Sequence, residues 1–196
     1  FWHKGDKGQR SKRVEVWKQW DSNANGYLSL AECDSNIKSH LISHCKSKVK
    51  GEAIWRRFRP SFIKAFNDAK DASPSRKGLN GDFITSPELR LFILYLDLYA
   101  TMFEVFALID GGSAGTTELD DRRIDPAEWK AAIEKVRKAG REWAPFVAIK
   151  NAAVADFQQV DANGGGFILL GEWASWIEAK EKSEATWIGQ QLGIGE

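Results

Sequence analysis

The chain has 196 residues, of which 43% are hydrophobic and 28% charged, and its formal net charge is +1. These values are typical of a globular protein with one domain or two small lobes. Aromatic residues make up 12% of the chain and include nine Trp, which excludes intrinsic disorder because such side chains need a packed interior. The two cysteines, Cys33 and Cys45, provide no disulfide framework, so a reducing compartment is favoured.

The small net charge conceals an asymmetry between the two halves of the chain. Residues 1–96 carry 18 Lys and Arg against 10 Asp and Glu, whereas residues 97–196 carry 10 against 17. We therefore expect the N-terminal half to suit an acidic surface such as lipid headgroups. The sequence has no nucleophile–base pairing, phosphate loop or dinucleotide fingerprint, which disfavours an enzyme.

Apolar spacing and helix-end signals predict a series of helices separated by polar loops. The first 11 residues are rich in Gly and Lys and are expected to be flexible. Pro60 is expected in the first turn of a helix, Ser86 is expected to cap one, and Gly140 is expected to end one. The expected helices span residues 12–20, 30–44, 60–70, 126–139, 145–160 and 172–179. A helical run is expected over 86–109, and residues 181–196 form a tail.

Residues 89–109 form an apolar stretch that is long enough for a membrane span. Arg90, Asp97 and Glu104 lie inside it, and each would cost about 2.5–3.5 kcal/mol near the middle of a bilayer. Two buried helices in succession are therefore favoured over a span.

The ends of four loops repeat one pattern, in which an aliphatic residue stands four positions before a Glu. This repeat predicts four helix–loop–helix units. Paired units of this kind share a short two-strand bridge, and we expect Leu28 to pair with Ile84 and Ile124 with Ile168. The four pairs are Leu28 and Glu32, Ile84 and Glu88, Ile124 and Glu128, and Ile168 and Glu172.

Residues 21–32 match the EF-hand calcium loop at every defining position. A hard divalent cation needs six to eight oxygen ligands at about 2.3–2.6 Å, and this spacing wraps them around the ion. Gly26 stands at the position of the sharp turn. An Asx-rich turn without metal is disfavoured by agreement over the whole loop. The expected ligands are Asp21, Asn23, Asn25, the Tyr27 carbonyl, Ser29 and Glu32.

Residues 161–172 form a second, poorer loop of the same kind. Gly165 at position 5 and Leu169 at position 9 offer no side-chain oxygen, so water must substitute there. We expect weaker binding than in the first loop. The positions assigned to the metal are Asp161, Asn163, Gly165, the Phe167 carbonyl and Glu172.

The two remaining loops depart from the pattern. The third spans 19 residues from Asp110 to Glu128 where 12 are needed, so seven are inserted. The second has Lys77 and Leu79 at positions that require ligands, and Asp82 in place of the turn glycine, so no metal is expected there. The candidate weak ligands of the third loop are Asp110, Asp120, Asp121 and Glu128.

Over about residues 10–180 the chain resembles the flagellar calcium-binding proteins, the calflagin family of EF-hand proteins. The resemblance implies four hands in two lobes, calcium sensing, and attachment to the flagellar membrane through an acylated, basic N-terminus. The insertion in the third loop departs from the family pattern. The matching residues are Arg13, Glu15, Trp17, Lys18, Trp20 and Asp21; Asp82, Phe83, Ile84, Glu88, Leu89, Arg90 and Leu91; Phe106, Ile109 and Asp110; and Phe157, Asp161, Asn163, Gly166, Glu172, Trp173, Ala174 and Trp176.

These observations predict an all-α protein of four EF-hand units in two paired lobes, with short two-strand bridges. The flexible segment is expected over residues 1–11, the N-terminal lobe over 12–97, the C-terminal lobe over 98–180 and the tail over 181–196. The tail, which contains Trp187 and Ile188, is expected to dock either on the protein itself or on a partner.

The expected function is that of a calcium sensor in a flagellum or cilium, or in the cytoplasm. It would bind one or two Ca²⁺ ions, with Mg²⁺ as a competitor, and contact a protein partner or an anionic membrane, but no nucleic acid. The alternative is a structural subunit of a large assembly with vestigial hands. Basic residues interleaved with aromatic ones are candidates for membrane or partner contact: Lys46, Lys48, Lys50, Arg56 and Arg57.

Overall fold

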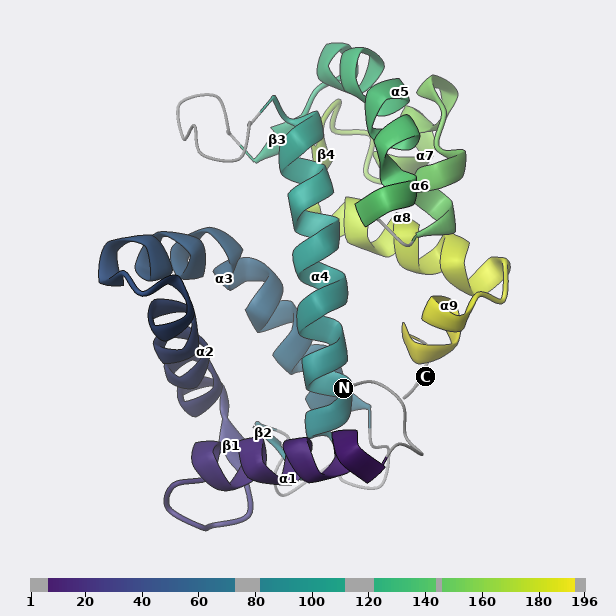
Figure 1. Ribbon diagram of the computed structural model, residues 1–196. Coiled ribbons are helices and arrows are strands. Elements are labelled where there is room, and N and C mark those ends of the chain that lie inside the picture. The colour runs from purple at the N-terminus through teal and green to yellow at the C-terminus, as the bar shows by residue number, and fades with distance from the viewer. Residues whose placement is uncertain (1–6, 73–81, 112–121, 144–145, 193–196) are drawn as a thin grey trace. The chain divides into compact units, whose positions relative to one another are not determined.

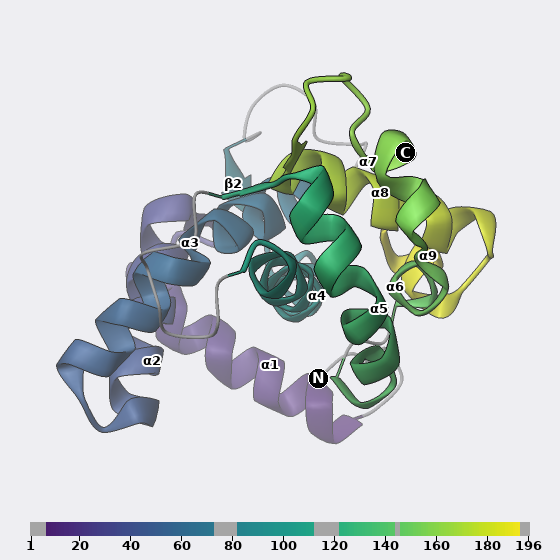
Figure 2. The same cartoon turned by 90° about the horizontal axis from the view of Figure 1, so that it is seen from above.

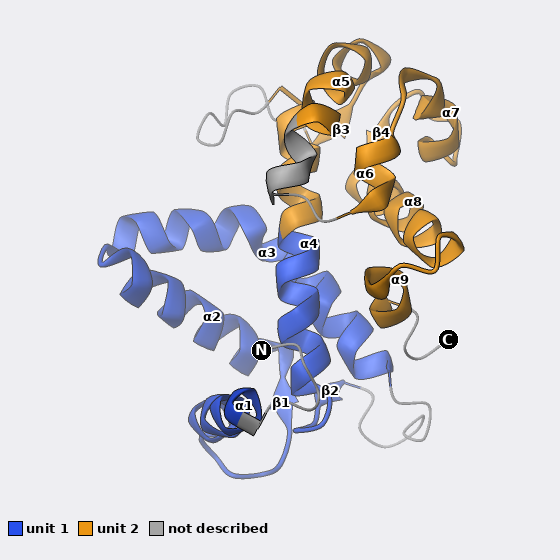
Figure 3. Cartoon of the chain, turned by 45° about the vertical axis from the view of Figure 1, so that its right-hand side comes forward, with its two compact units in different colours: residues 1–100, 195–196 blue, residues 101–194 orange. Residues whose placement is uncertain are grey.

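The computed structural model describes residues 7–72, 82–111, 122–143 and 146–192, and these are mostly helical (Figure 1). The chain divides into two compact units, and the division falls within one long helix (Figure 3). The first unit runs from Phe1 to Ala100 and the second from Thr101 to Ile194. Each unit is described separately below.

Unit 1 contains the first two helix–loop–helix hands. Its elements are α1 (Lys7–Trp20), β1 (Leu28–Ser29), α2 (Leu30–Cys45), α3 (Lys48–Asp71), β2 (Phe83–Ile84) and the first part of α4 (Leu89–Ile109). Unit 2 contains the other two hands. Its elements are the rest of α4, β3 (Arg123–Ile124), α5 (Pro126–Trp143), α6 (Val147–Asn151), the 3₁₀ turn η2 (Val154–Asp156), α7 (Phe157–Val160), β4 (Ile168–Leu169), α8 (Leu170–Ser183) and α9 (Trp187–Leu192).

Both expected two-strand bridges are confirmed. Leu28 of β1 pairs with Ile84 of β2, and Ile124 of β3 pairs with Ile168 of β4, both in antiparallel register. All four side chains are fully buried, so each bridge joins two loops and also begins the core of its unit. The all-α class with paired loops is therefore confirmed.

The first helix begins at Lys7, before the expected start at Lys12. Residues 7–11 are therefore helical, where the sequence predicted a segment without secondary structure. Gly8 is the only helix-breaking residue in this stretch, and a single Gly costs only about 1 kcal/mol in a helix. Residues 1–6 lie outside the described residues.

The position expected for Pro60 is wrong, because it lies inside α3 and not in its first turn. An internal proline costs about 3 kcal/mol or more, because its nitrogen cannot donate to the preceding turn. The helix continues because the turns after Pro60 bury Phe62 and Phe66 in the core of unit 1. Phe66 meets Phe92 of α4 edge to face, with ring centroids 6.1 Å apart.

Residues 89–109 form the single helix α4 and not two helices in succession. Figure 2 shows this helix nearly along its axis. By length and composition α4 could cross a membrane, but 61% of its most apolar window is buried inside the structure, as expected for a core helix. The cap expected at Ser86 is wrong, because α4 begins at Leu89. The Thr85 N–H and hydroxyl donate to the Glu88 carboxylate just before it.

Two expected boundaries in unit 2 are also wrong. Gly140 does not end α5, which continues to Trp143. Residues 145–160 do not form one helix, because α6, η2 and α7 follow one another with a break after Asn151. Trp129 explains the break: its indole N–H lies 3.2 Å from the carbonyl oxygens of both Ala153 and Val154, which holds the backbone out of helical register.

The core of unit 2 is built on tryptophan. Trp129 and Trp173 are fully buried and meet edge to face at 6.0 Å, while Trp173 stacks on Trp176 at 5.6 Å. The Trp173 indole donates to the Met102 carbonyl oxygen at 2.8 Å. The helix α9 packs against α8 and buries Ile188, so this part of the tail docks on its own unit.

Gly51 allows α2 and α3 to pack closely, and its replacement tests this packing. A Cβ at Gly51 would lie 2.5 Å from the Ile42 Cα, and a backbone atom cannot give way as a flexible side chain can. We expect Gly51→Ala to lower the free energy of unfolding by about 1–3 kcal/mol, measured by urea denaturation in chelator. Gly171→Ala is the control, because nothing lies within 4 Å of its Cβ position, and it should be neutral or slightly stabilising. Equal effects would contradict the close packing.

Candidate metal centres

The first loop is held in a ring by its own acidic and amide side chains. The Asp21 carboxylate accepts the backbone N–H groups of Asn25 at 3.0 Å and of Gly26 at 3.1 Å. The Asn23 side-chain oxygen accepts the Asn25 N–H at 2.9 Å, and the Asn25 side-chain oxygen accepts the Tyr27 N–H at 2.8 Å. Gly26 has a φ of +80°, the left-handed conformation that the sharp turn requires.

Glu32 closes this ring from the far end. Its carboxylate accepts the Ser29 backbone N–H and hydroxyl, both at 2.8 Å, and the Asn23 side-chain amide at 3.0 Å. Ser29 in turn accepts the Glu32 backbone N–H at 3.2 Å, so the two residues form the capping box that starts α2. The residues at positions 3, 9 and 12 of the loop are therefore drawn together.

The donor set of this loop fits calcium. Two carboxylates, two side-chain amides, a hydroxyl and a backbone carbonyl provide at least six hard oxygens, within the coordination range of Ca²⁺. Nitrogen and sulfur ligands, which zinc prefers, are absent from the set. Asp21, Asn23, Asn25, Tyr27, Ser29 and Glu32 are the residues that would hold the ion. A bound ion would supply positive charge that binds the carboxylates more strongly than the present N–H donors.

The fourth loop repeats the same hydrogen bonds with fewer donors. The Asp161 carboxylate accepts the N–H groups of Gly165 at 3.0 Å and Gly166 at 2.9 Å, and the Asn163 side-chain oxygen accepts the Gly165 N–H at 2.6 Å. Glu172 accepts the Asn163 N–H at 3.1 Å and the Leu169 N–H at 3.0 Å.

The fourth loop offers five hard oxygens at loop positions that match those of the first. They come from Asp161, Asn163, the Phe167 carbonyl and the two carboxylate oxygens of Glu172. Gly165 contributes no side chain, so water must complete the shell of an ion. The donor chemistry therefore fits calcium at lower affinity than in the first loop.

Despite the insertion, the third loop keeps the left-handed turn and the hydrogen bond to its first Asp that the first loop has. Arg122 stands six residues before Glu128, as Gly26 stands before Glu32, and it adopts a φ of +62°. Its N–H donates to the buried Asp110 carboxylate at 3.1 Å, the same bond that Gly26 makes to Asp21. Sequence reasoning missed this role of Arg122, which counting back from Glu128 would have revealed. The other candidate ligands, Asp120 and Asp121, lie outside the described residues.

Asp125 and Glu128 serve the helix that follows the third loop. The Asp125 side chain accepts the N–H groups of Ala127 at 2.7 Å and Glu128 at 2.8 Å, and the Glu128 carboxylate accepts the Asp125 N–H at 2.8 Å. These bonds cap the N-terminus of α5. A bound metal is not needed to explain either residue.

The Glu that ends each loop has a structural role in all four hands. In the second hand, where no metal is expected, the Glu88 carboxylate still accepts the N–H and hydroxyl of Thr85 at 2.8 Å. Glu32, Glu128 and Glu172 make the matching bond to the residue three positions earlier. This Glu therefore explains the internal repeat of the sequence, but it does not by itself mark a metal site.

The basic candidate residues lie away from the loops. Lys46, Lys48 and Lys50 are exposed where α2 turns into α3, and Arg56 is exposed one to two turns further along α3. The fifth, Arg57, is half-buried beside the Phe58 ring. All five lie on the α2–α3 hairpin of unit 1, and none of them belongs to the first loop.

Cys33 offers a direct probe of this first loop. It is fully buried next to Glu32, and burial raises the pKa of its thiol, with the charges of Glu32 and Asp34 adding to the effect. A protonated, buried thiol reacts with iodoacetamide only when the structure opens. We expect saturating calcium, at about 100 times its Kd, to slow Cys33 alkylation about 100-fold.

The half-buried Cys45 is the internal control for this labelling. Its modification rate, followed by mass spectrometry of the two peptides, should exceed that of Cys33 and change little with calcium. An unchanged Cys33 rate in calcium would contradict ion binding at the first loop.

Comparison with known proteins finds similarity to flagellar calcium-binding proteins. Residues 3–96 match the model of the FCaBP EF-hand domain. Flagellar calcium-binding protein TB-17 of Trypanosoma brucei brucei is 27% identical over 177 residues, which cover 90% of this chain and 66% of TB-17. TB-44A of the same organism is 27% identical over 90% of this chain and 38% of its own length. The flagellar calcium-binding protein of Trypanosoma cruzi is 26% identical over 87% of this chain and 71% of its own length.

Proposed function

The chain carries an FCaBP EF-hand domain and is a distant relative of the trypanosome flagellar calcium-binding proteins, and from this premise we propose that it regulates a flagellar or ciliary process in response to calcium. EF-hand proteins of this family are not enzymes. One or two ions would bind, in the first and fourth loops. Calcium would then change how unit 1 or unit 2 contacts a partner.

The first loop carries this proposal. Its side chains already form the ring of hydrogen bonds described above, and Asn23 already reaches Glu32 at 3.0 Å. The side chains of the first loop therefore lie close to one another, and an ion would compete with the N–H donors for their oxygens. The modest number of carboxylates, two in each loop, suits a Kd of about 10⁻⁷–10⁻⁵ M or weaker.

A groove beside the fourth loop supports coupling to a protein partner. It has a volume of about 890 Å³, is lined by Pro126, Trp129, Val154 and Phe157, and borders the metal residue Asp161. Val154 is 41% exposed there. Because one wall of the groove is the loop itself, an ion that tightens the loop would change the shape that a partner meets.

The size of the expected response is limited. One ion at 100 times its Kd contributes about 2.7 kcal/mol, whereas driving a two-state equilibrium from 1:99 to 99:1 needs about 5.5 kcal/mol. One site in each unit can therefore shift a balanced equilibrium but not a strongly biased one. This favours a graded sensor.

Isothermal titration calorimetry and tryptophan fluorescence test the proposal together. Calcium is expected to release or absorb heat in one or two saturable events and to change the emission of the nine Trp residues, while Mg²⁺ competes only at much higher concentration. No heat and no emission change would overturn the proposal. That result would favour the alternative of a structural subunit, in which the Glu caps serve only the helices.

A further inference from the structure

The turn between α2 and α3 (residues 46–50) is rich in lysine, and we call it the hairpin tip. Lys46 adopts a left-handed φ of 48° and donates its N–H to the Ser43 carbonyl at 3.1 Å. Ser47 caps α3 by accepting the Lys50 N–H at 3.3 Å. These bonds fix the path of the backbone through the turn.

The positive charge of the tip is not neutralised locally. Lys46, Lys48 and Lys50 are exposed, and none of them forms an ion pair with another of the described residues. Residues 38–59 contain seven Lys and Arg but a single acidic residue, Glu52.

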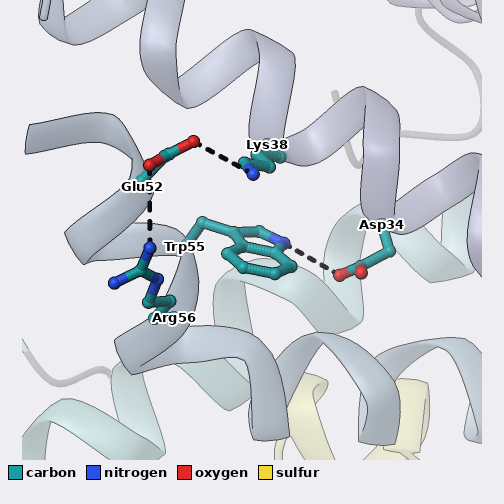
Figure 4. Close-up of polar contacts among 5 residues, drawn as sticks. All are labelled: Asp34, Lys38, Glu52, Trp55 and Arg56. Atoms are coloured by element: carbon teal, nitrogen blue, oxygen red, sulfur yellow. Dashed lines mark hydrogen bonds and ion pairs between the residues drawn. The ribbon is translucent and has the colours of Figure 1, made fainter. Parts of the chain in front are cut away.

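The acidic side chains of the hairpin are already occupied. Figure 4 shows Glu52 between Lys38, at 3.1 Å, and Arg56, at 3.7 Å. The hydrogen bond from Lys38 is the main reason that the pKa of Glu52 lies below its ordinary value. Asp34 accepts the Trp55 indole N–H at 2.9 Å and pairs with Arg59 at 3.2 Å. The three lysines of the tip therefore face solvent with their charge available to a partner.

An aliphatic side chain stands among these lysines. Val49 is 79% exposed, more than any other large hydrophobic residue among the described parts of the chain, and Ile54, just over one turn further along α3, is 37% exposed. A single exposed aliphatic residue would need no explanation. The position of Val49 between Lys48 and Lys50 does need an explanation. Lysines can keep their ammonium groups at lipid phosphates while an aliphatic side chain between them enters the acyl region.

We propose that the hairpin tip docks on an anionic lipid bilayer, with Lys46, Lys48 and Lys50 at the phosphates and Val49 inserted between them. The tip is a convex turn that projects from the rest of unit 1 (Figure 3), a shape that suits a broad surface better than an extended peptide. The tip shares no residue with the calcium loops. This contact is therefore independent of calcium binding and goes beyond the proposed function.

Vesicle co-sedimentation tests the charged part of the contact. The triple variant Lys46→Gln, Lys48→Gln, Lys50→Gln is expected to bind phosphatidylserine-containing vesicles about 100-fold more weakly than the wild type, because each basic residue near an anionic surface contributes roughly fivefold. The control variant Lys130→Gln, Lys135→Gln, Lys138→Gln removes the same charge from exposed positions of α5 and should lose less than about fivefold. Equal losses would overturn the proposal.

A pair of valine variants tests insertion. Val49→Ser is expected to weaken vesicle binding about fivefold, while Val14→Ser, at a residue that is 45% exposed on α1, should leave it unchanged. If both valine variants changed vesicle binding equally, insertion of Val49 would be overturned. The basic charge of the tip would then favour an acidic protein surface as its partner. All substituted residues are exposed, so thermal unfolding should match the wild type, and circular dichroism verifies this.

The measurements are made both in calcium and in chelator. Loss of vesicle binding in the triple variant should be the same in both conditions. A chain that binds no calcium would overturn the proposed function without changing this result, and a wild type that ignores anionic vesicles would overturn the docking alone.

Discussion

Glu32→Gln is expected to abolish the tighter calcium-binding event, whereas Glu172→Gln should remove only the weaker one. Glu32 is the residue that would hold the ion with both carboxylate oxygens, and glutamine offers one oxygen and no charge. We expect the affinity of the first loop to fall at least 100-fold, or about 2.8 kcal/mol, measured by isothermal titration calorimetry. Glutamine can still accept the Ser29 N–H, so α2 keeps part of its cap.

Glu15→Gln is the matched control, because this residue is exposed on α1 and outside the loops. It should change neither event. Equal losses from Glu32→Gln and Glu172→Gln would show that the two loops are ranked wrongly, and a loss from Glu15→Gln would show a general effect of charge.

Trp173→Ala is expected to cause the largest loss of stability in unit 2. The side chain is fully buried, stacks on Trp176, meets Trp129 edge to face and donates to the Met102 carbonyl. Removing a buried Trp costs about 3–5 kcal/mol through lost burial and the cavity that remains. Unfolding is measured by urea denaturation in chelator, followed by circular dichroism, so that ion binding at the neighbouring candidate ligand Glu172 does not affect the result.

Trp187→Ala removes the same side chain from a position that is 46% exposed. Its expected loss is within about 1 kcal/mol, since nearly half of the side chain already meets water. Similar losses from both variants would mean that the aromatic core of unit 2 does not carry its stability.

The hands and their pairing could be predicted because they depend on local spacing. The twelve-residue loop from Asp21 to Glu32 specifies its own ring of hydrogen bonds, and the aliphatic residue before each Glu predicts the bridge partners, such as Leu28 and Ile84. These signals lie within a few residues of one another. They are read directly from the sequence and need no knowledge of the core.

The boundaries that were wrong depend on contacts between distant residues. Pro60 is tolerated inside α3 because the turns beyond it are buried, which no local rule can show. The break after Asn151 follows from Trp129, more than twenty residues earlier in the chain, whose indole reaches the Ala153 and Val154 carbonyls. The local helix signal at Pro145 could not reveal this break.

The candidate site shows the same division. The side chains that the sequence predicts as ligands in the first loop are joined by hydrogen bonds within that loop, and their binding of an ion stays a prediction. The turn at Arg122 was missed because the inserted residues hide its register from a reading that starts at Asp110. Counting back from Glu128 identifies this turn, because the capping Glu marks the end of the loop in every hand.

The capping role of the last loop residue bears on how such hands can diverge after duplication. A hand that stops binding cations still needs its glutamate to start a helix, as Glu88 does for α4. Substitutions that abolish ion binding can therefore lie at the earlier loop positions, while the Glu at position 12 is kept. In each of the four repeats, substitutions near the loop's start would change the oxygens available to an ion while the capping bond of the last Glu remains.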